Sequence, residues 1–230
     1  MRISSSSISQ PIALTPTRES LVYALFAVAM ALTAVGVFVG MLYAPTLLRS
    51  GVLLLFVFAE LGLIMTSAWW SRQTPLNMLL FVLFPLLSGI TITPYLLSVL
   101  AGYANGGSIL LNAFASTACM ALAAAVVART TSWDLSFLGR GLFLGVIGLL
   151  LMGVLQIFVP SLRTGLFELF LSGAGVVLFA LFTAYDLQRI QVMGRMGASP
   201  FLLALSLYLD IFNLFLYVVR FMVALSGDRR

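Results

Sequence analysis

Histidine and lysine are both absent from this chain of 230 residues, and cysteine occurs only once, at Cys119. Without histidine, the chain cannot form His-based metal sites or Ser–His nucleophile pairs, and rhomboid-type proteolysis is excluded. Without lysine, no retinal Schiff base can form, and all 12 basic residues are arginine. A single cysteine allows neither an internal disulfide nor a thiolate metal cluster, and we interpret Cys119 as a small packing residue in a helix.

Charged residues are also scarce. They make up 8% of the sequence, whereas hydrophobic residues make up 62% and the mean hydropathy is +1.14. A soluble domain carries roughly 25% charged residues, so the composition predicts an integral membrane protein. The polar, Ser/Pro/Thr-rich residues 1–20 are predicted to form a disordered N-terminal tail rather than a cleaved signal peptide. The net charge of +5 favours contact with anionic lipid headgroups, and nothing suggests a nucleic-acid surface.

Seven apolar segments are long enough to cross a bilayer, which takes about 20 residues in a helix. They cover residues 21–43, 51–71, 76–100, 108–128, 137–159, 166–190 and 201–224. Prolines and polar turns separate them, and the connections are too short to hold a second domain. We therefore predict an all-α integral membrane protein with one seven-helix domain at 21–224 and a short C-terminal tail at 225–230.

The arginines between the predicted spans indicate how the chain is oriented. Five lie in connections on the side of the N-terminus and two lie on the other side (Arg72, Arg129, Arg140, Arg189 and Arg195 against Arg49 and Arg163). Because positively charged connections tend to stay in the cytoplasm, this bias predicts a cytoplasmic N-terminus and an external C-terminus.

The last predicted span carries a row of polar side chains through an otherwise apolar helix. Steps of four, three, four and three residues place them on one helical face: Ser206, Asp210, Asn213, Tyr217 and Arg220. A charged Asp at the centre of a membrane helix costs roughly 2.5–3.5 kcal/mol, so this face is expected to point into the bundle or a wet cavity. We call this row the polar stripe.

Asp210 has a predicted partner in Asp186, which shares a face of the preceding helix with Thr183 and Arg189. The turn between the two helices centres near residue 198, and each aspartate lies 12 residues from it. In an antiparallel hairpin the two carboxylates therefore lie at equal depth. Two carboxylates in apolar surroundings cannot both ionise at low cost, so we expect them to share a proton, bind a cation, be clamped by Arg or merely fix helix packing.

Three further charged residues are candidates for roles near this pair. Glu60 lies in the middle of the second predicted span, and either a functional role or local hydrogen bonding would account for it. Arg72, at the inner end of the same span, either reaches the pair or anchors the span at the membrane surface. Glu168 is predicted to be a solvated residue at a helix N-terminus.

Several segments resemble the Bax inhibitor-1 family, also called the transmembrane Bax-inhibitor-motif proteins. The resemblance rests on "AYDLQRIQ" at 184–191 and "ALSLYLDIFNLFLYVVRF" at 204–221, with "SGITITP" at 88–94 and "DLSFLG" at 134–139. It implies a seven-helix fold in which helix seven is central and enclosed by the other six. It also implies a pH-sensitive calcium leak governed by an aspartate dyad, which falls on Asp186 and Asp210.

The resemblance also implies an arginine at the inner end of helix two that interacts with the dyad in bacterial relatives. Here "AWWSRQ" offers only Arg72 for that role. Some eukaryotic relatives suppress cell death, and some bacterial ones restrain a membrane protease. The compact connections and the absence of an organelle-retention signal favour a bacterial member located in the inner membrane.

The resulting hypothesis is a pH-sensitive calcium leak channel, which is not an enzyme and needs no obligatory cofactor. Its expected partners are the lipid bilayer, protons and Ca²⁺, which takes about six to eight oxygen ligands. Asp186 and Asp210 would supply two of these, and water, backbone carbonyls or Asn213 the rest. Ser206, Glu60 and Arg72, together with Asn213, are predicted to support the site or its gating.

Three alternatives remain at this point. A proton-coupled carrier would use the aspartates as a relay, and a regulatory protein would bind a membrane protease or another membrane partner. An intramembrane aspartyl protease also has two aspartates on adjacent helices. Its second motif, Gly-x-Gly-Asp, is replaced here by "LYLD", and no "PAL" follows.

Overall fold

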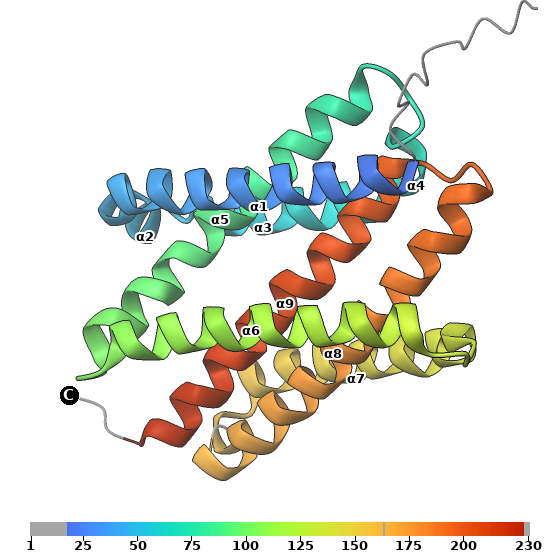
Figure 1. Cartoon of the computed structure of the whole chain (residues 1–230). Helices are drawn as coiled ribbons and strands as arrows, with labels where there is room; N and C mark the ends of the chain where they lie inside the picture. The colour runs from blue at the N-terminus through green and yellow to red at the C-terminus, as the bar shows by residue number, and fades with distance from the viewer. Residues whose placement is uncertain (1–17, 163, 228–230) are drawn as a thin grey trace, which may run out of the picture.

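The chain is helical throughout the part that the structure describes. The structure is a computed structural model that describes residues 18–162 and 164–227, and every regular element in these residues is a helix. The elements are α1 (Arg18–Leu42), α2 (Ala44–Ser50), α3 (Val52–Met65), α4 (Ser67–Trp70), α5 (Leu76–Gly102), α6 (Gly106–Thr130), η1 (Leu135–Phe137), α7 (Leu138–Phe158), η2 (Pro160–Leu162), α8 (Gly165–Arg195) and α9 (Pro200–Ser226). The all-α class predicted from the sequence is confirmed for these residues (Figure 1).

Six helices, α1 and α5 to α9, are long and apolar enough to cross a membrane. Large apolar side chains are exposed along them, such as Leu150 at 63% and Phe170 at 70%. Such surfaces are stable only against lipid, because in water a contiguous apolar surface of this extent would aggregate. The composition and the helices together therefore establish an integral membrane protein in contact with the bilayer.

The second predicted span, residues 51–71, is divided in the structure into α3 and α4. The break lies at Thr66, whose hydroxyl donates to the Gly62 carbonyl at 2.7 Å, and the Trp70 indole donates across the break to the Leu63 carbonyl at 2.9 Å. The 14 residues of α3 extend about 21 Å, less than the ~30 Å of a hydrocarbon core. A seventh crossing therefore stays a prediction.

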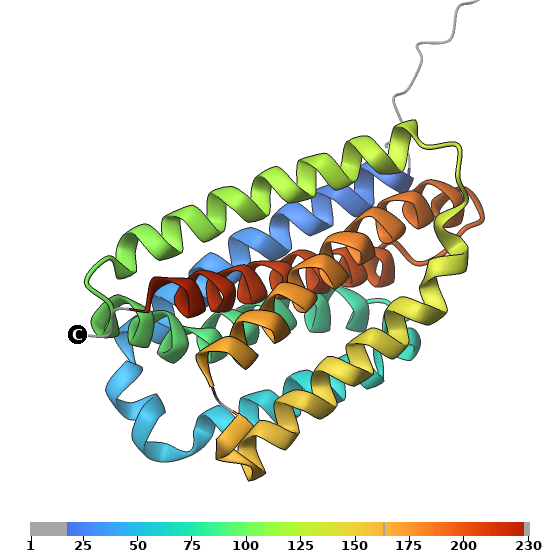
Figure 2. The same ribbon diagram turned by 90° about the horizontal axis from the view of Figure 1, so that it is seen from below.

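The ends of the helical region differ slightly from the predicted boundaries. Helix α1 begins at Arg18, inside the predicted tail at 1–20, and α9 ends at Ser226, two residues beyond 224. Residues 1–17 and 228–230, which hold the rest of both predicted tails, lie outside the described residues. The start of α1 and the end of α9 lie at opposite ends of the bundle (Figures 1 and 2).

Helix α9 is covered along nearly its whole length. It forms an antiparallel hairpin with α8 and also packs against α1, α5 and α6. Among the residues of α9, only Leu225 is exposed. Figure 2 shows α1 and α6 on one side of α9, and α3 and α7 on the other. The closest packing involves four helices, so enclosure by all six others stays a prediction.

Small residues let α1 and α5 approach closely. A Cβ on Gly36 would collide with the Leu86 carbonyl, and one on Gly89 would collide with the Thr33 carbonyl. Membrane helices lack a strong hydrophobic drive to associate, so close backbone packing of this kind holds them together. This contact fixes the position of α5, whose polar residues face the site described next.

Candidate functional site

Asp186 and Asp210 lie on neighbouring helices, α8 and α9, and both are buried. Asp186 is 3% exposed and Asp210 is 7% exposed. The connection between the helices turns at Gly197, whose φ of +87° suits glycine, and Pro200 starts α9 in its first turn. This tight turn brings the two chain segments back along each other, so the two carboxyl groups are close enough to interact electrostatically.

The two carboxyl groups have different surroundings. Asp186 Oδ1 lies 3.5 Å from a guanidinium nitrogen of Arg189, which is one turn further along α8, and the Ser206 hydroxyl of α9 lies beside the same carboxyl group. Asp210 Oδ2 is buried and has no hydrogen-bond partner among the described residues. One carboxylate is therefore compensated by a positive charge, and the other presents an oxygen with unused hydrogen-bonding capacity.

A cavity of about 720 Å³ adjoins Asp210, between α3, α5, α7, α8 and α9. All residues of the polar stripe line it: Ser206, Asp210, Asn213, Tyr217 and Arg220. The expectation that this face of the helix points into the bundle or a wet cavity is therefore met by the geometry. The Asn213 amide donates to the Leu209 carbonyl at 2.7 Å, which leaves its amide oxygen available as a potential ligand.

Glu60 reaches the same cavity from α3. Its Oε1 accepts a hydrogen bond from the Thr91 hydroxyl of α5 at 3.0 Å, and the Ser88 hydroxyl lies nearby. Local hydrogen bonding, one of the two interpretations open from the sequence, is thus present. A functional role for Glu60 stays a prediction.

Arg72 lies apart from the aspartates in this structure. Its side chain is exposed, and the guanidinium that pairs with Asp186 belongs to Arg189. The segment around Arg72 is nevertheless tied to the hairpin, because the Ser199 hydroxyl donates to the Ser71 carbonyl at 2.8 Å. A role for Arg72 in gating stays a prediction.

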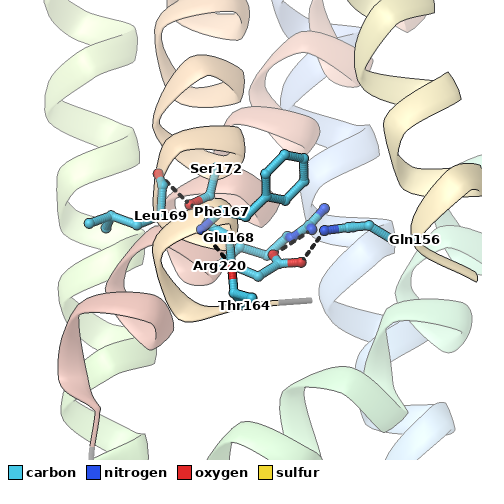
Figure 3. Close-up of polar contacts among 7 residues, drawn as sticks. All are labelled: Gln156, Thr164, Phe167, Glu168, Leu169, Ser172 and Arg220. Carbon is cyan, nitrogen blue, oxygen red and sulfur yellow. Dashed lines mark hydrogen bonds and ion pairs between the residues drawn. The ribbon is translucent and has the colours of Figure 1, made fainter. Parts of the chain in front are cut away.

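A second charged cluster lies at the other end of the polar stripe (Figure 3). Arg220 Nη2 is 2.8 Å from Glu168 Oε2, and the Gln156 amide donates to Glu168 Oε1 at 2.6 Å. The Arg220 guanidinium also lies over the Tyr217 ring, 5.4 Å from its centroid. Glu168 is in the first turn of α8, as predicted, but its side chain is only 28% exposed and is held in an ion pair rather than solvated.

The connection between α6 and α7 is fastened to α8 by one glutamine. Gln188 accepts from the Leu135 backbone N–H at 2.7 Å and donates to the Trp133 carbonyl at 2.9 Å. In the same connection, the Ser136 backbone N–H donates to Asp134, and this bond lowers the pKa of that carboxyl below its ordinary value. Two segments noted in the sequence, "AYDLQRIQ" and "DLSFLG", are thereby in direct contact beside Arg189.

Comparison with known proteins identifies the relatives of this chain. The sequence model described as inhibitor of apoptosis-promoting Bax1 matches residues 17–227. The chain belongs to the Bax inhibitor-1 family. The family assignment made from the motifs is confirmed.

The relatives of this Bax inhibitor-1 family member come from bacteria, animals and viruses. An uncharacterized Campylobacter jejuni protein is 36% identical over 195 residues, 84% of this chain and 82% of its own length. Mouse protein lifeguard 4 is 30% identical over 175 residues, 76% of this chain and 69% of its own. The vaccinia virus Golgi anti-apoptotic protein is 32% identical over 165 residues, 71% of this chain and 65% of its own.

Sequence patterns did not predict two features of the site in this family member. The ion pair of Glu168 with Arg220 and the two-bond clamp by Gln188 both join residues more than 50 positions apart, with separations of 52 and 53. The polar stripe gave a signal for Arg220, since an arginine on an inward face requires a partner. Gln188 lies within the segment "AYDLQRIQ", but no spacing in the sequence indicated its clamp on the α6–α7 connection.

Proposed function

We propose that this protein is a pH-sensitive calcium leak channel in which Asp186 and Asp210 bind protons or Ca²⁺ and gate the pathway. The observation that carries the proposal is the buried Asp210 carboxyl, which has an oxygen without a partner among the described residues, a neighbouring carboxyl and a large cavity beside it. A carboxyl in that setting stays uncharged or acquires a cation, because an isolated charge there is costly.

The proposed gate has a closed and an open arrangement. When the aspartates share a proton, the carboxyl–carboxyl contact holds α8 against α9, and Arg189, which lies on α8 itself, offsets the negative charge on Asp186. Loss of the shared proton leaves two negative groups, which repel each other and attract Ca²⁺. Besides Asp186 and Arg189, which act on Asp210, the charged groups that line the adjoining cavity are Glu60 of α3 and, further along α9, Arg220, which Glu168 neutralises.

Calcium is the expected ion because it prefers oxygen ligands and tolerates irregular coordination. Among the described residues no group of three acidic, His or Cys side chains converges. The protein would therefore supply two carboxylates and the Asn213 amide oxygen, and water and backbone carbonyls would fill the remaining positions. Such a site binds Ca²⁺ weakly enough to release it, as conduction requires.

The proposal also includes the cellular location and the membrane topology of the protein. We place the protein in a bacterial inner membrane, with its N-terminus in the cytoplasm and its C-terminus outside. Helix α9 is proposed as the central one of seven crossings, with α3 and α4 together forming the second. No enzymatic activity and no obligatory cofactor belong to the proposal.

Calcium binding to variants of the purified protein tests the role of the aspartates. Wild type, Asp186→Asn, Asp210→Asn and the double variant are titrated with Ca²⁺ in nanodiscs at several pH values from mildly acidic to mildly alkaline. Wild type is expected to bind more tightly as pH rises, since Ca²⁺ competes with protons for the same oxygens. Asp134→Asn, which alters a carboxyl outside the membrane, serves as the control and should behave as wild type.

Each single variant is expected to weaken Ca²⁺ binding and to flatten its pH dependence. The amide is close in shape to the carboxyl, so folding should be largely preserved, which circular dichroism checks. Identical titration curves for all four folded proteins would show that the aspartates only pack α8 against α9.

A second candidate function is control of a membrane-protein partner. The observation that favours it is the name of one relative, the Golgi anti-apoptotic protein of vaccinia virus, which describes an effect on cell fate rather than transport. Cross-linking in the native membrane, followed by identification of partners that require Asp186 or Asp210, tests this candidate separately from ion flux.

A further inference from the structure

The cavity beside Asp210 is lined mainly by aliphatic and aromatic side chains. Phenylalanines reach it from four helices, including Phe84 of α5, Phe143 of α7, Phe179 of α8 and Phe212 of α9. Its volume of about 720 Å³ lies inside the range of roughly 300–1,000 Å³ that is typical of small-molecule sites. The apolar part of this wall offers no oxygen ligands to a metal ion, so it leaves room for a second kind of occupant.

The wall of the cavity also carries an excess of acidic groups. Glu60 of α3 and Asp210 of α9 both line it. Among its described lining residues the one basic side chain is Arg220, which is already paired with Glu168 at 2.8 Å. Two carboxyl groups therefore face the cavity, and the described lining residues offer no further cation to balance them.

Asp210 also limits which kind of ligand can bind in the cavity. Its Oδ2 atom is buried and lacks a hydrogen-bond partner among the described residues. Buried oxygens of this kind are nearly always paired, so Oδ2 can take either a proton shared with Asp186 or a donor from a ligand. A bare positive charge would satisfy the electrostatics, but an N–H donor would satisfy both the charge and the hydrogen bond.

We propose that this cavity binds a lipophilic ammonium, meaning a protonated amine with aromatic or alkyl arms. Its N–H group would donate to Asp210, its charge would be shared with Glu60, and its arms would pack on the phenylalanines. Aromatic faces attract cations as well as apolar groups, so the wall suits both parts of such a ligand. The proposal goes beyond the calcium leak, because it requires occupancy of the cavity and no ion movement.

Dibenzylammonium is a suitable probe, because it has two aromatic arms and a protonated amine with two N–H donors. Its binding to the full-length protein in nanodiscs is measured by equilibrium dialysis in the absence of Ca²⁺, with empty nanodiscs subtracted. Dibenzyl ether, which has a similar shape but no charge and no donor, is the matched control ligand. We expect saturable binding of one dibenzylammonium per protein and binding of the ether weaker by about tenfold or more.

Variants locate the bound probe. Asp210→Asn removes the charge and should weaken dibenzylammonium binding by about tenfold, and Glu60→Gln should weaken it by a smaller factor. Asp134→Asn, outside the cavity, should leave binding unchanged. Val146→Trp, on the α7 wall, narrows the cavity and should weaken binding, and Val57→Trp does the same from the α3 wall if the first variant fails to fold.

Equal binding of the ether and the ammonium would overturn the proposal, because it would mean that only apolar partition operates. Wild-type affinity in both Asp210→Asn and Val146→Trp would overturn it as well, because the probe would then bind elsewhere. The dibenzylammonium binding experiment can succeed or fail whether or not the protein conducts Ca²⁺. Dibenzylammonium binding in a protein that passes no Ca²⁺ refutes the leak alone, and Ca²⁺ flux without dibenzylammonium binding refutes the ammonium site alone.

Discussion

Breaking the ion pair between Glu168 and Arg220 is expected to destabilise the protein more than breaking the pair between Glu19 and Arg129. In the first pair the charged atoms are 2.8 Å apart and the side chains are 28% and 29% exposed. In the second pair they are 3.5 Å apart, with side chains 32% and 64% exposed. The two pairs thus offer the same chemistry at different depths within one chain.

The exposed fractions of the side chains set the expected coupling free energy of each ion pair. Exposed ion pairs contribute about 0.2–1 kcal/mol, whereas hydrogen bonds to charged groups away from water contribute about 1.5–3 kcal/mol. Most of each side chain in the Glu168–Arg220 pair is covered, so we expect a coupling free energy of about 1.5–2 kcal/mol. For Glu19 and Arg129 we expect less than about 0.5 kcal/mol.

A double-mutant cycle measures each coupling. Glu168→Gln, Arg220→Gln and the double variant are unfolded by denaturant in mixed micelles, and the free energy of unfolding is followed by circular dichroism. The cycle cancels the contact of Arg220 with Tyr217, because that contact is lost in both variants that lack the arginine. Glu19→Gln and Arg129→Gln form the control cycle. A Glu168–Arg220 coupling below about 0.5 kcal/mol, or equal to that of the control pair, would show that burial does not strengthen this ion pair.

Three further predictions address packing, the clamp and topology. Gly89→Val should cost at least about 1–3 kcal/mol of stability, because the valine side chain would collide with the α1 backbone. Gly102→Ala should be well tolerated, because a Cβ at that position meets no neighbouring atom. Thermal unfolding of the two variants compares their stabilities. Gln188→Ala should increase proteolysis in the α6–α7 connection, because two hydrogen bonds are lost, while the exposed Gln73→Ala should not. Reporter fusions should place the N-terminus in the cytoplasm and the C-terminus outside, and both ends on one side would disprove the predicted topology.

The sequence predicted the features that depend on periodicity. Hydropathy located the six long helices, because about 20 apolar residues in a row have no other stable location. The steps of the polar stripe put Asp210 and Arg220 on one face, and both line the cavity. The tight turn at Gly197 brought Asp186 alongside, since equal distances from a turn give equal depth in a hairpin.

The sequence did not predict contacts that depend on how distant helices rotate against each other. Glu168 meets Arg220 only because the start of α8 faces the end of α9, and the residue count along one helix carries no such information. Thr66 interrupts the second predicted span although most of the surrounding residues are apolar, so hydropathy passed over the break. The arginine that pairs with Asp186 is Arg189, which the sequence had already placed on the same helical face. Arg72 had been a candidate from its position at the end of the second predicted span and from the resemblance.

Calcium flux into liposomes that contain only this protein decides whether the aspartates gate a leak. Wild-type protein is expected to admit Ca²⁺ faster than empty liposomes, at a rate that depends on pH. Asp186→Asn with Asp210→Asn should remove that pH dependence, while Asp134→Asn should retain it. Flux no faster than in empty liposomes, or the same pH profile in wild type and the folded double variant, would contradict a calcium leak gated by these aspartates.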